Sequence, residues 1–97
     1  MSKSILQTKK ECWVCKTTQN LHRHHCLGGA NRKHSEKYGL TIYLCGYHHN
    51  LSNEGVHFNK ELDLLVKQFA QKKFEEIYSH ELFMKEFRVN WLGKEFK

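Results

Sequence analysis

Apolar residues in the second half of the chain recur at spacings of three and four. From residue 59 onward the series comprises Leu62, Leu65, Val66, Phe69, Ala70, Phe74, Ile77 and Tyr78. This spacing predicts an amphipathic helix whose N-cap is Asn59. Ser79 is the predicted cap of a further short helix that carries Leu82, Phe83 and Phe87. We expect both apolar stripes to pack into the core.

The first half of the chain follows a different pattern. Residues 40–44, Leu-Thr-Ile-Tyr-Leu, are β-branched or aromatic at their centre and predict a strand, with residues 21–27 as a candidate second strand. Residues 28–33, Gly-Gly-Ala-Asn-Arg-Lys, contain breaker residues that predict a loop. Residues 46–52 fit a short helix. The predicted order is strand, loop, strand, helix, which indicates a small α+β fold.

The length of 97 residues suggests a single domain, close to the lower size limit for a self-sufficient core. We expect a basic arm over residues 1–11, a metal-rich core over 12–57 and a helical extension over 58–97. No repeat, low-complexity stretch or proline separates these parts. A domain of this size is commonly stabilised by a structural metal ion.

The cellular compartment decides how the four cysteines are interpreted. Residues 1–11 do not resemble a signal peptide, and no apolar run approaches the roughly 20 residues that a membrane span needs. We therefore expect a soluble, cytoplasmic protein with no membrane contact. In a reducing cytoplasm, a C-x-x-C pair indicates a metal or redox site rather than a structural disulfide.

The net charge of +6 is concentrated in the first half of the chain. Residues 1–50 contain eight Lys and Arg against Glu11 and Glu36 alone, which leaves a surplus of six, whereas residues 51–97 contain eight of each sign. A basic tail with solubilising lysines would explain this surplus. A metal-rich face that binds a polyanion would also explain it, and nucleic acid is the commonest such partner.

Two close pairs of metal-ligating residues fit one tetrahedral zinc site. Cys12 and Cys15 form the first pair on a predicted turn, and Cys45 and His48 form the second, with the three-residue spacing that suits one side of a helical turn. We therefore predict a structural zinc ion on these four residues.

Other arrangements of the cysteines are weaker. Cys26 could replace His48 as a ligand, although its place after the histidine doublet suits a small buried residue. A C2H2 finger needs about 12 residues between its Cys and His pairs, but only eight separate Cys15 from His24. A thioredoxin-like motif needs a βαβ context that the chain does not suggest.

The histidines outside this set can build a second, open site. Neighbouring residues of a strand point to opposite faces, so His24 and His25 are expected to differ in role, one as a metal ligand and the other as a base. His49 is turned by about 100° from His48 around a helix and can face a different ion. The alternative is that these are surface histidines of a basic protein.

The histidine doublet, the Gly/Asn-rich loop and the Cys45-x-x-His48-His49 segment resemble the HNH endonuclease family, with its ββα-metal core. The chain is most similar to small phage-encoded HNH proteins, including recombination-enhancement nucleases. The resemblance covers about residues 12–57, and more loosely the helical tail. It implies a catalytic ion on His24 and His49, with His25 as general base.

The resemblance also implies roles for other residues. Asn31 takes the place of the middle Asn of the motif, and His57 is a candidate third ligand or phosphate contact. Cys12, Cys15, Cys45 and His48 match the structural zinc of many members. The catalytic ion would be Mg²⁺, Mn²⁺, Ni²⁺ or Zn²⁺, and imidazole ligands favour the softer ions over Mg²⁺.

The implied reaction is hydrolysis of a DNA phosphodiester bond with little sequence specificity. His25 would take a proton from water while the ion stabilises charge on the phosphate and the leaving oxygen. Predicted phosphate contacts flank the doublet and its loop, although each also fits a solvated charged face. They are Arg23, Arg32, Lys33 and Lys37.

Three functions follow from these expectations. The first is an HNH-type nuclease or nickase acting on double- or single-stranded DNA. The second is a non-catalytic, zinc-stabilised module that binds nucleic acid. The third is a nuclease that acts only with a recombination or phage packaging protein, in the cytoplasm of a bacterial host if the protein is phage-encoded.

Overall fold

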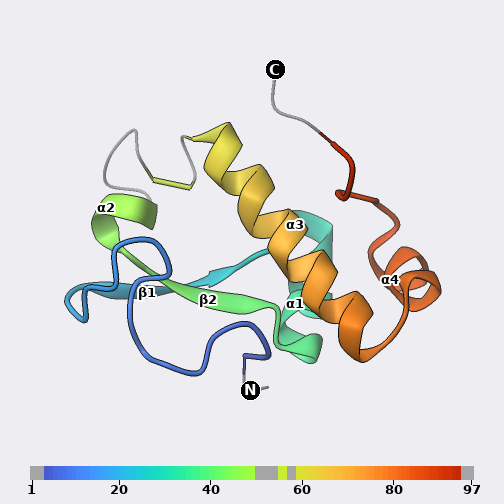
Figure 1. Ribbon diagram of the computed structural model, residues 1–97, viewed down its shortest axis with the longest axis horizontal. Helices are drawn as coiled ribbons and strands as arrows, with labels where there is room; N and C mark the ends of the chain where they lie inside the picture. The colour runs from blue at the N-terminus through green and yellow to red at the C-terminus, as the bar shows by residue number, and fades with distance from the viewer. Residues whose placement is uncertain (1–3, 50–54, 57–58, 95–97) are drawn as a thin grey trace.

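The computed structural model describes residues 4–49, 55–56 and 59–94 (Figure 1). They form a mixed α+β fold with one two-stranded sheet. The elements in chain order are β1 (Leu21–His25), a short 3₁₀ turn (Gly29–Asn31), α1 (Arg32–Tyr38), β2 (Thr41–Cys45), α2 (Gly46–His49), α3 (Lys60–Ile77) and α4 (His80–Phe87).

The two strands pair antiparallel, and the register sets which side chains share a face. His22 lies opposite Leu44, and His24 lies opposite Ile42. Because side chains alternate along a strand, His22 and His24 lie on one face of β1, whereas Arg23 and His25 lie on the other. Both strands were predicted, with ends that differ by one or two residues from those observed.

The N-terminal segment is part of the fold, which corrects the expectation of a basic arm for residues 4–11. Gln7 accepts a hydrogen bond from the backbone N–H of Tyr43 at 2.8 Å, and Ile5 donates its N–H to the carbonyl of Gly39 at 2.9 Å. Ile5 and Leu6 pack against the core. The segment runs beside β2, on the edge that β1 leaves open (Figure 1).

Helix α1 was not predicted. Residues 28–33 were expected to form a loop, and no helix was expected between the two strands. The 3₁₀ turn at Gly29–Asn31 leads directly into α1. Gly39 follows the last residue of α1 as its C-cap, with φ of 72°, in the left-handed region that favours glycine. The one buried residue of α1 is Ser35, which donates a hydrogen bond to the carbonyl of Leu27 at 2.7 Å. Because the buried residue of this seven-residue helix is a serine, the sequence shows no apolar stripe that would predict the helix.

The two C-terminal helices begin where the sequence predicts. The Asn59 side chain accepts a hydrogen bond from the N–H of Leu62, and Ser79 does the same for Leu82. Both are N-cap bonds, which satisfy donors that the first helical turn leaves unpaired.

The apolar stripe of α3 is only partly buried. Val66, Ala70 and Phe74 are fully buried, but Leu65 is 52% exposed and Ile77 is 56% exposed. Tyr78, which follows the helix, is also exposed. The expectation that the whole stripe packs into the core was therefore wrong. Leu65 is exposed because it lies about 100° around the helix from the buried Val66. Ile77 is the last residue of α3 and is also exposed.

Aromatic rings connect α1, α3 and α4 into one core. The ring centroid of Phe74 lies 5.0 Å from that of Tyr38 and 5.5 Å from that of Phe83, and Phe83 stacks on Phe87 at 4.6 Å. The helical extension thus shares its core with the metal-rich half of the chain.

None of the helices in the described part of the chain has the length and apolar character that a membrane span requires.

Adjacent substitutions in α3 test which face of the helix is buried. Val66→Ala removes buried methyl groups and is expected to lower the free energy of unfolding by roughly 1–3 kcal/mol. Leu65→Ala removes more atoms but from an exposed side chain, so its effect should stay within about 0.5 kcal/mol. Urea denaturation of the zinc-loaded protein measures both. Equal losses would contradict the observed orientation of α3.

Candidate metal centre and histidine pocket

The four predicted zinc ligands come together in the structure. The ligand atoms of Cys12, Cys15, Cys45 and His48 all lie within 4.8 Å of one another. The sulfurs of Cys15 and Cys45 are 3.8 Å apart, and the His48 Nδ1 lies 3.7 Å from the Cys12 sulfur and 3.3 Å from the Cys45 sulfur. A tetrahedral zinc ion would set these separations at about 3.8 Å between sulfurs and about 3.5 Å between sulfur and nitrogen. The four residues can therefore hold a metal ion such as zinc.

Short-range backbone contacts place the two ligand pairs. The turn of Cys12–Cys15 closes with a hydrogen bond from the N–H of Lys16 to the carbonyl of Cys12 at 2.9 Å. The N–H of Trp13 donates to the carbonyl of Tyr43 at 2.8 Å, which ties the turn to β2. Cys45 ends β2, and His48 follows on α2. The turn and the β2–α2 junction thus face each other.

The electrostatics of the cysteine sulfurs favour a bound cation. Burial raises the pKa of Cys12, but backbone N–H groups at Cys15, Cys45 and Val14 outweigh it and lower the pKa to about 6. The pKa of Cys45 is raised, first by its burial and then by the neighbouring sulfurs of Cys12 and Cys15. Thiolates crowded together repel one another, so their joint ionisation needs a positive ion between them.

Cys26 is not a member of this group. It is fully buried within the apolar core, and burial raises the pKa of its thiol far above the usual range. A neutral buried thiol acts as a small packing residue rather than a ligand. This agrees with the reading of Cys26 as a packing residue.

The imidazoles of His22, His24 and His49 form a second cluster, separate from the cysteine-rich group. The ring centroid of His49 lies 5.0 Å from that of His22 and 5.4 Å from that of His24. The Nδ1 atoms of His22 and His49 are 2.9 Å apart. His22 was not among the predicted site residues. The alternation of Leu-His-Arg-His in a strand was the signal that places it on the same face as His24.

His25 faces a carboxylate instead of another histidine. Its Nε2 lies 2.7 Å from the Glu36 Oε2 atom, and Arg23 contacts the other oxygen of Glu36 at 3.4 Å. The hydrogen bond from His25 is the largest influence on Glu36 and lowers its pKa, with a further contribution from the charge of Arg23. Glu36 comes from the unpredicted helix α1, and so it was missed in the sequence.

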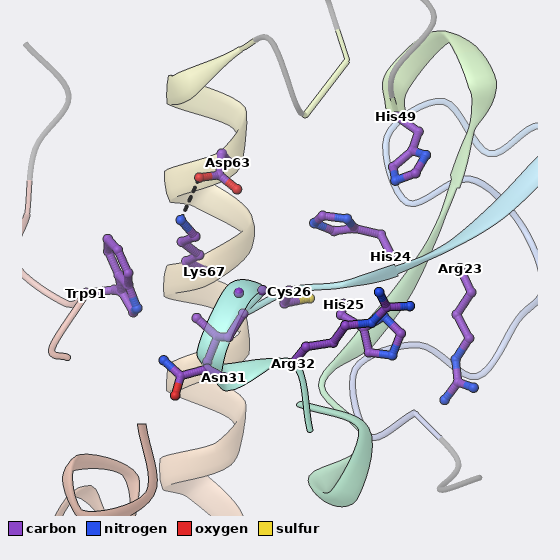
Figure 2. Close-up of a pocket in the computed structure, with 13 residues that line it drawn as sticks. Arg23, His24, His25, Cys26, Asn31, Arg32, His49, Asp63, Lys67 and Trp91 are labelled. Carbon is purple, nitrogen blue, oxygen red and sulfur yellow. Dashed lines mark ion pairs between the residues drawn. The ribbon is translucent and has the colours of Figure 1, made fainter. Parts of the chain in front are cut away.

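A pocket of about 560 Å³ separates the sheet from α3. His24, His25 and His49 line one part of it, and Asp63 and Lys67 line the opposite part from α3, where they form an ion pair at 2.7 Å (Figure 2). The other lining residues are Arg23, Cys26, Leu27, Gly28, Gly29, Asn31, Arg32 and Trp91. The predicted ligands His24 and His49 and the predicted base His25 therefore border one cavity.

The remaining predicted residues occupy different places. Arg32 is exposed and lines the pocket, whereas Lys33 and Lys37 are exposed on α1 outside its lining. The ammonium of Lys37 lies 5.2 Å from the ring of Tyr38. Asn31 also lines the pocket.

The side chain of Asn31 holds its loop against another element. Its Nδ2 donates a hydrogen bond to the carbonyl of Phe87, at the end of α4, at 3.2 Å. His57, the candidate third ligand, lies outside the described residues.

Comparisons of the chain with protein-family models, curated proteins and solved structures gave no match.

Single-cysteine variants distinguish the metal ligands from the packing cysteine. Cys12→Ala is expected to lose the bound zinc and much of the stability, because metal-binding energy contributes directly to folding. Cys26→Ala should keep one zinc per chain, although its cavity lowers the melting temperature. Elemental analysis of the purified proteins measures the zinc. Retention of zinc by the Cys12 variant, or its loss from the Cys26 variant, would contradict the assignment.

Proposed function

We propose that the protein is a metal-dependent endonuclease that hydrolyses DNA phosphodiester bonds with little sequence specificity. The observation that carries the proposal is the His25–Glu36 pair at the edge of a pocket that two further imidazoles, His24 and His49, also line. In this proposal Cys12, Cys15, Cys45 and His48 bind a structural zinc. The proposal also rests on the resemblance of the His24-His25 and Cys45-x-x-His48-His49 motifs to HNH endonucleases.

The partner of His25 determines which of its nitrogens is basic. A carboxylate only accepts hydrogen bonds, so in the neutral imidazole the Nε2 atom carries the proton and donates it to Glu36. The lone pair then lies on Nδ1, which can accept a proton from an attacking water molecule. Glu36 fixes both the tautomer and the orientation of the ring. The side chain of His25 is 16% exposed, and His25 is among the residues that line the pocket.

His24 and His49 are the proposed ligands of a catalytic divalent ion. Such an ion, when bound, stabilises negative charge on the phosphate and on the leaving oxygen. Imidazole ligands favour Mn²⁺, Ni²⁺ or Zn²⁺ over Mg²⁺, which prefers oxygen. His57 remains a candidate third ligand.

Basic residues near the pocket are the proposed contacts for the DNA backbone. The net surplus of positive charge lies within residues 1–50, and Arg32, Lys33 and Lys37 present exposed charges on α1. These contacts would be to phosphates, which carry no sequence information. Arg23 pairs with Glu36, so we propose that its main role is to support the carboxylate.

The alternative is a non-catalytic, zinc-stabilised module that binds nucleic acid. The His25–Glu36 pair favours an enzyme, because neither residue belongs to the cysteine-rich metal group. A nuclease that needs a recombination or phage packaging protein would be inactive on naked duplex. Protein-coated single strands should therefore be tested beside supercoiled plasmid.

Substitution of the base tests catalysis directly. With Mn²⁺, Ni²⁺ or Mg²⁺ present, His25→Ala should reduce the rate of plasmid nicking by at least about 100-fold, because the general base is lost. Glu36→Gln should lower kcat at least about tenfold with little change in KM, since it disturbs only the tautomer and the orientation of the ring.

A matched control for these variants lies elsewhere in the chain. His80 forms a similar pair with Glu75, at 2.7 Å, but is 54% exposed and outside the pocket lining. His80→Ala should leave the nicking rate unchanged. If wild-type protein leaves both plasmid and protein-coated single strands intact with every ion, the non-catalytic alternative is correct.

The salt dependence of DNA binding tests the proposed phosphate contacts. Replacing Arg32, Lys33 or Lys37 singly by Ala should weaken binding and reduce the slope of log K against log salt by about 0.9 for each lost contact. Lys72→Ala removes an exposed positive charge from α3 and serves as the control. Fluorescence anisotropy with a duplex of random sequence measures the slopes. Identical slopes for all four variants would contradict this surface.

A further inference from the structure

His22 lies closer to His49 than the predicted ligand His24 does. The ring centroids of His22 and His49 are 5.0 Å apart, against 5.4 Å for His24 and His49. The pairing of β1 with β2 places His22 and His24 two residues apart on the same face of β1. The imidazole of His49 approaches that face from α2, as the ring contacts show.

The separation of the two Nδ1 atoms fits ligands of a common ion. Two imidazole nitrogens bound to one ion at about 2.0–2.1 Å lie about 3.3–3.4 Å apart when the angle at the ion is tetrahedral, and about 2.9 Å apart when it is 90°. The Nδ1 atoms of His22 and His49 are 2.9 Å apart. The same distance also fits a hydrogen bond between the two rings, in which one nitrogen donates and the other accepts.

We infer that His24 joins the His22–His49 pair after a rotation of its side chain. Among the residues that the structure describes, the group of Cys12, Cys15, Cys45 and His48 is the only set of three or more His, Cys, Asp or Glu residues whose ligand atoms all lie within 4.8 Å of one another. The His24 ring is in edge contact with His49, and the second side-chain torsion of histidine has a broad energy minimum. Rotation about this torsion is therefore the movement by which we infer that a ring nitrogen of His24 would approach the pair.

We propose that His22, His24 and His49 together bind one divalent first-row ion. This inference rests on the proposed function, to which it adds His22 as a third protein ligand. Three imidazoles leave at least one coordination position open for water or a phosphate oxygen, as in catalytic zinc sites. The set contains no carboxylate, so it selects Zn²⁺, Co²⁺ or Ni²⁺ over Mg²⁺.

The two metal sites share helix α2 but not their ligands. His48 directs its Nδ1 at the sulfurs of Cys12 and Cys45, while the next residue, His49, contacts the rings on β1. The protein ligands of an ion at the histidines would therefore all be nitrogen atoms, with no sulfur among them. Its Co²⁺ form would lack the sulfur-to-metal charge-transfer absorption of the cysteine site.

Cobalt titration of the full chain tests the proposal without reference to catalysis. The protein is first loaded with one equivalent of Zn²⁺, which the cysteine site is expected to retain, and is then titrated with Co²⁺. Wild type should bind one Co²⁺ with visible absorption and no sulfur charge-transfer band. His22→Gln and His49→Ala should each weaken this binding by at least about tenfold, because the loss of a direct ligand should cost no less than the loss of an outer-sphere partner. His34→Ala is the control, because His34 pairs with Glu86 on α4.

Each outcome decides the question. Failure of wild type to bind Co²⁺ at nitrogen ligands, or unchanged affinity in His22→Gln with its zinc retained, would overturn the proposal and leave a hydrogen bond between His22 and His49. Weaker binding in both variants supports it. Because the readout is metal affinity, a positive result would stand even if no DNA were cleaved. Cleavage by wild type with unchanged Co²⁺ affinity in His22→Gln would leave the nuclease proposal intact.

Discussion

The arrangement of this small protein depends on one local constraint, the approach of the Cys12–Cys15 turn to the junction of β2 and α2. A backbone hydrogen bond from Trp13 to Tyr43 ties the turn to β2, and one from Gly46 to Asn20 ties the junction to the residue before β1. The ligand atoms of the turn and the junction lie at separations that suit a tetrahedral ion. The short helix α2 has four residues and a single buried one, so its own packing contributes little. Metal binding at His48 would therefore fix α2, and with it the position of His49 against β1.

Backbone geometry directs the two members of each adjacent histidine pair, His24-His25 and His48-His49, toward different groups. Successive residues of a helix point about 100° apart, so His48 and His49 face different groups. Successive residues of a strand point to opposite faces, so His24 contacts His49 while His25 contacts Glu36. A sulfur-rich group, an imidazole cluster and an imidazole–carboxylate pair thereby lie close together without sharing side chains. The proposed division into structural metal, catalytic metal and base rests on this separation.

The sequence predicted the features that depend on local spacing. The four residues of the metal group, both strands and the caps at Asn59 and Ser79 follow from motifs or from periodicity. Helix α1 was missed because its buried residue is the polar Ser35, and Glu36 was missed with it. Tertiary contacts, which spacing does not encode, decide that Gln7 pairs with β2 and that Leu65 is exposed. Helical periodicity alone could not separate the buried from the exposed part of the α3 stripe.

X-ray absorption at the zinc edge, with one equivalent of Zn²⁺ bound to the full chain, tests the central constraint most directly. The account predicts three sulfur neighbours at about 2.3 Å and one nitrogen neighbour at about 2.0 Å. A first shell of nitrogen and oxygen alone would place the ion among the histidines and contradict the account. Two sulfurs or four would also contradict it, because the ligand set would then differ from Cys12, Cys15, Cys45 and His48.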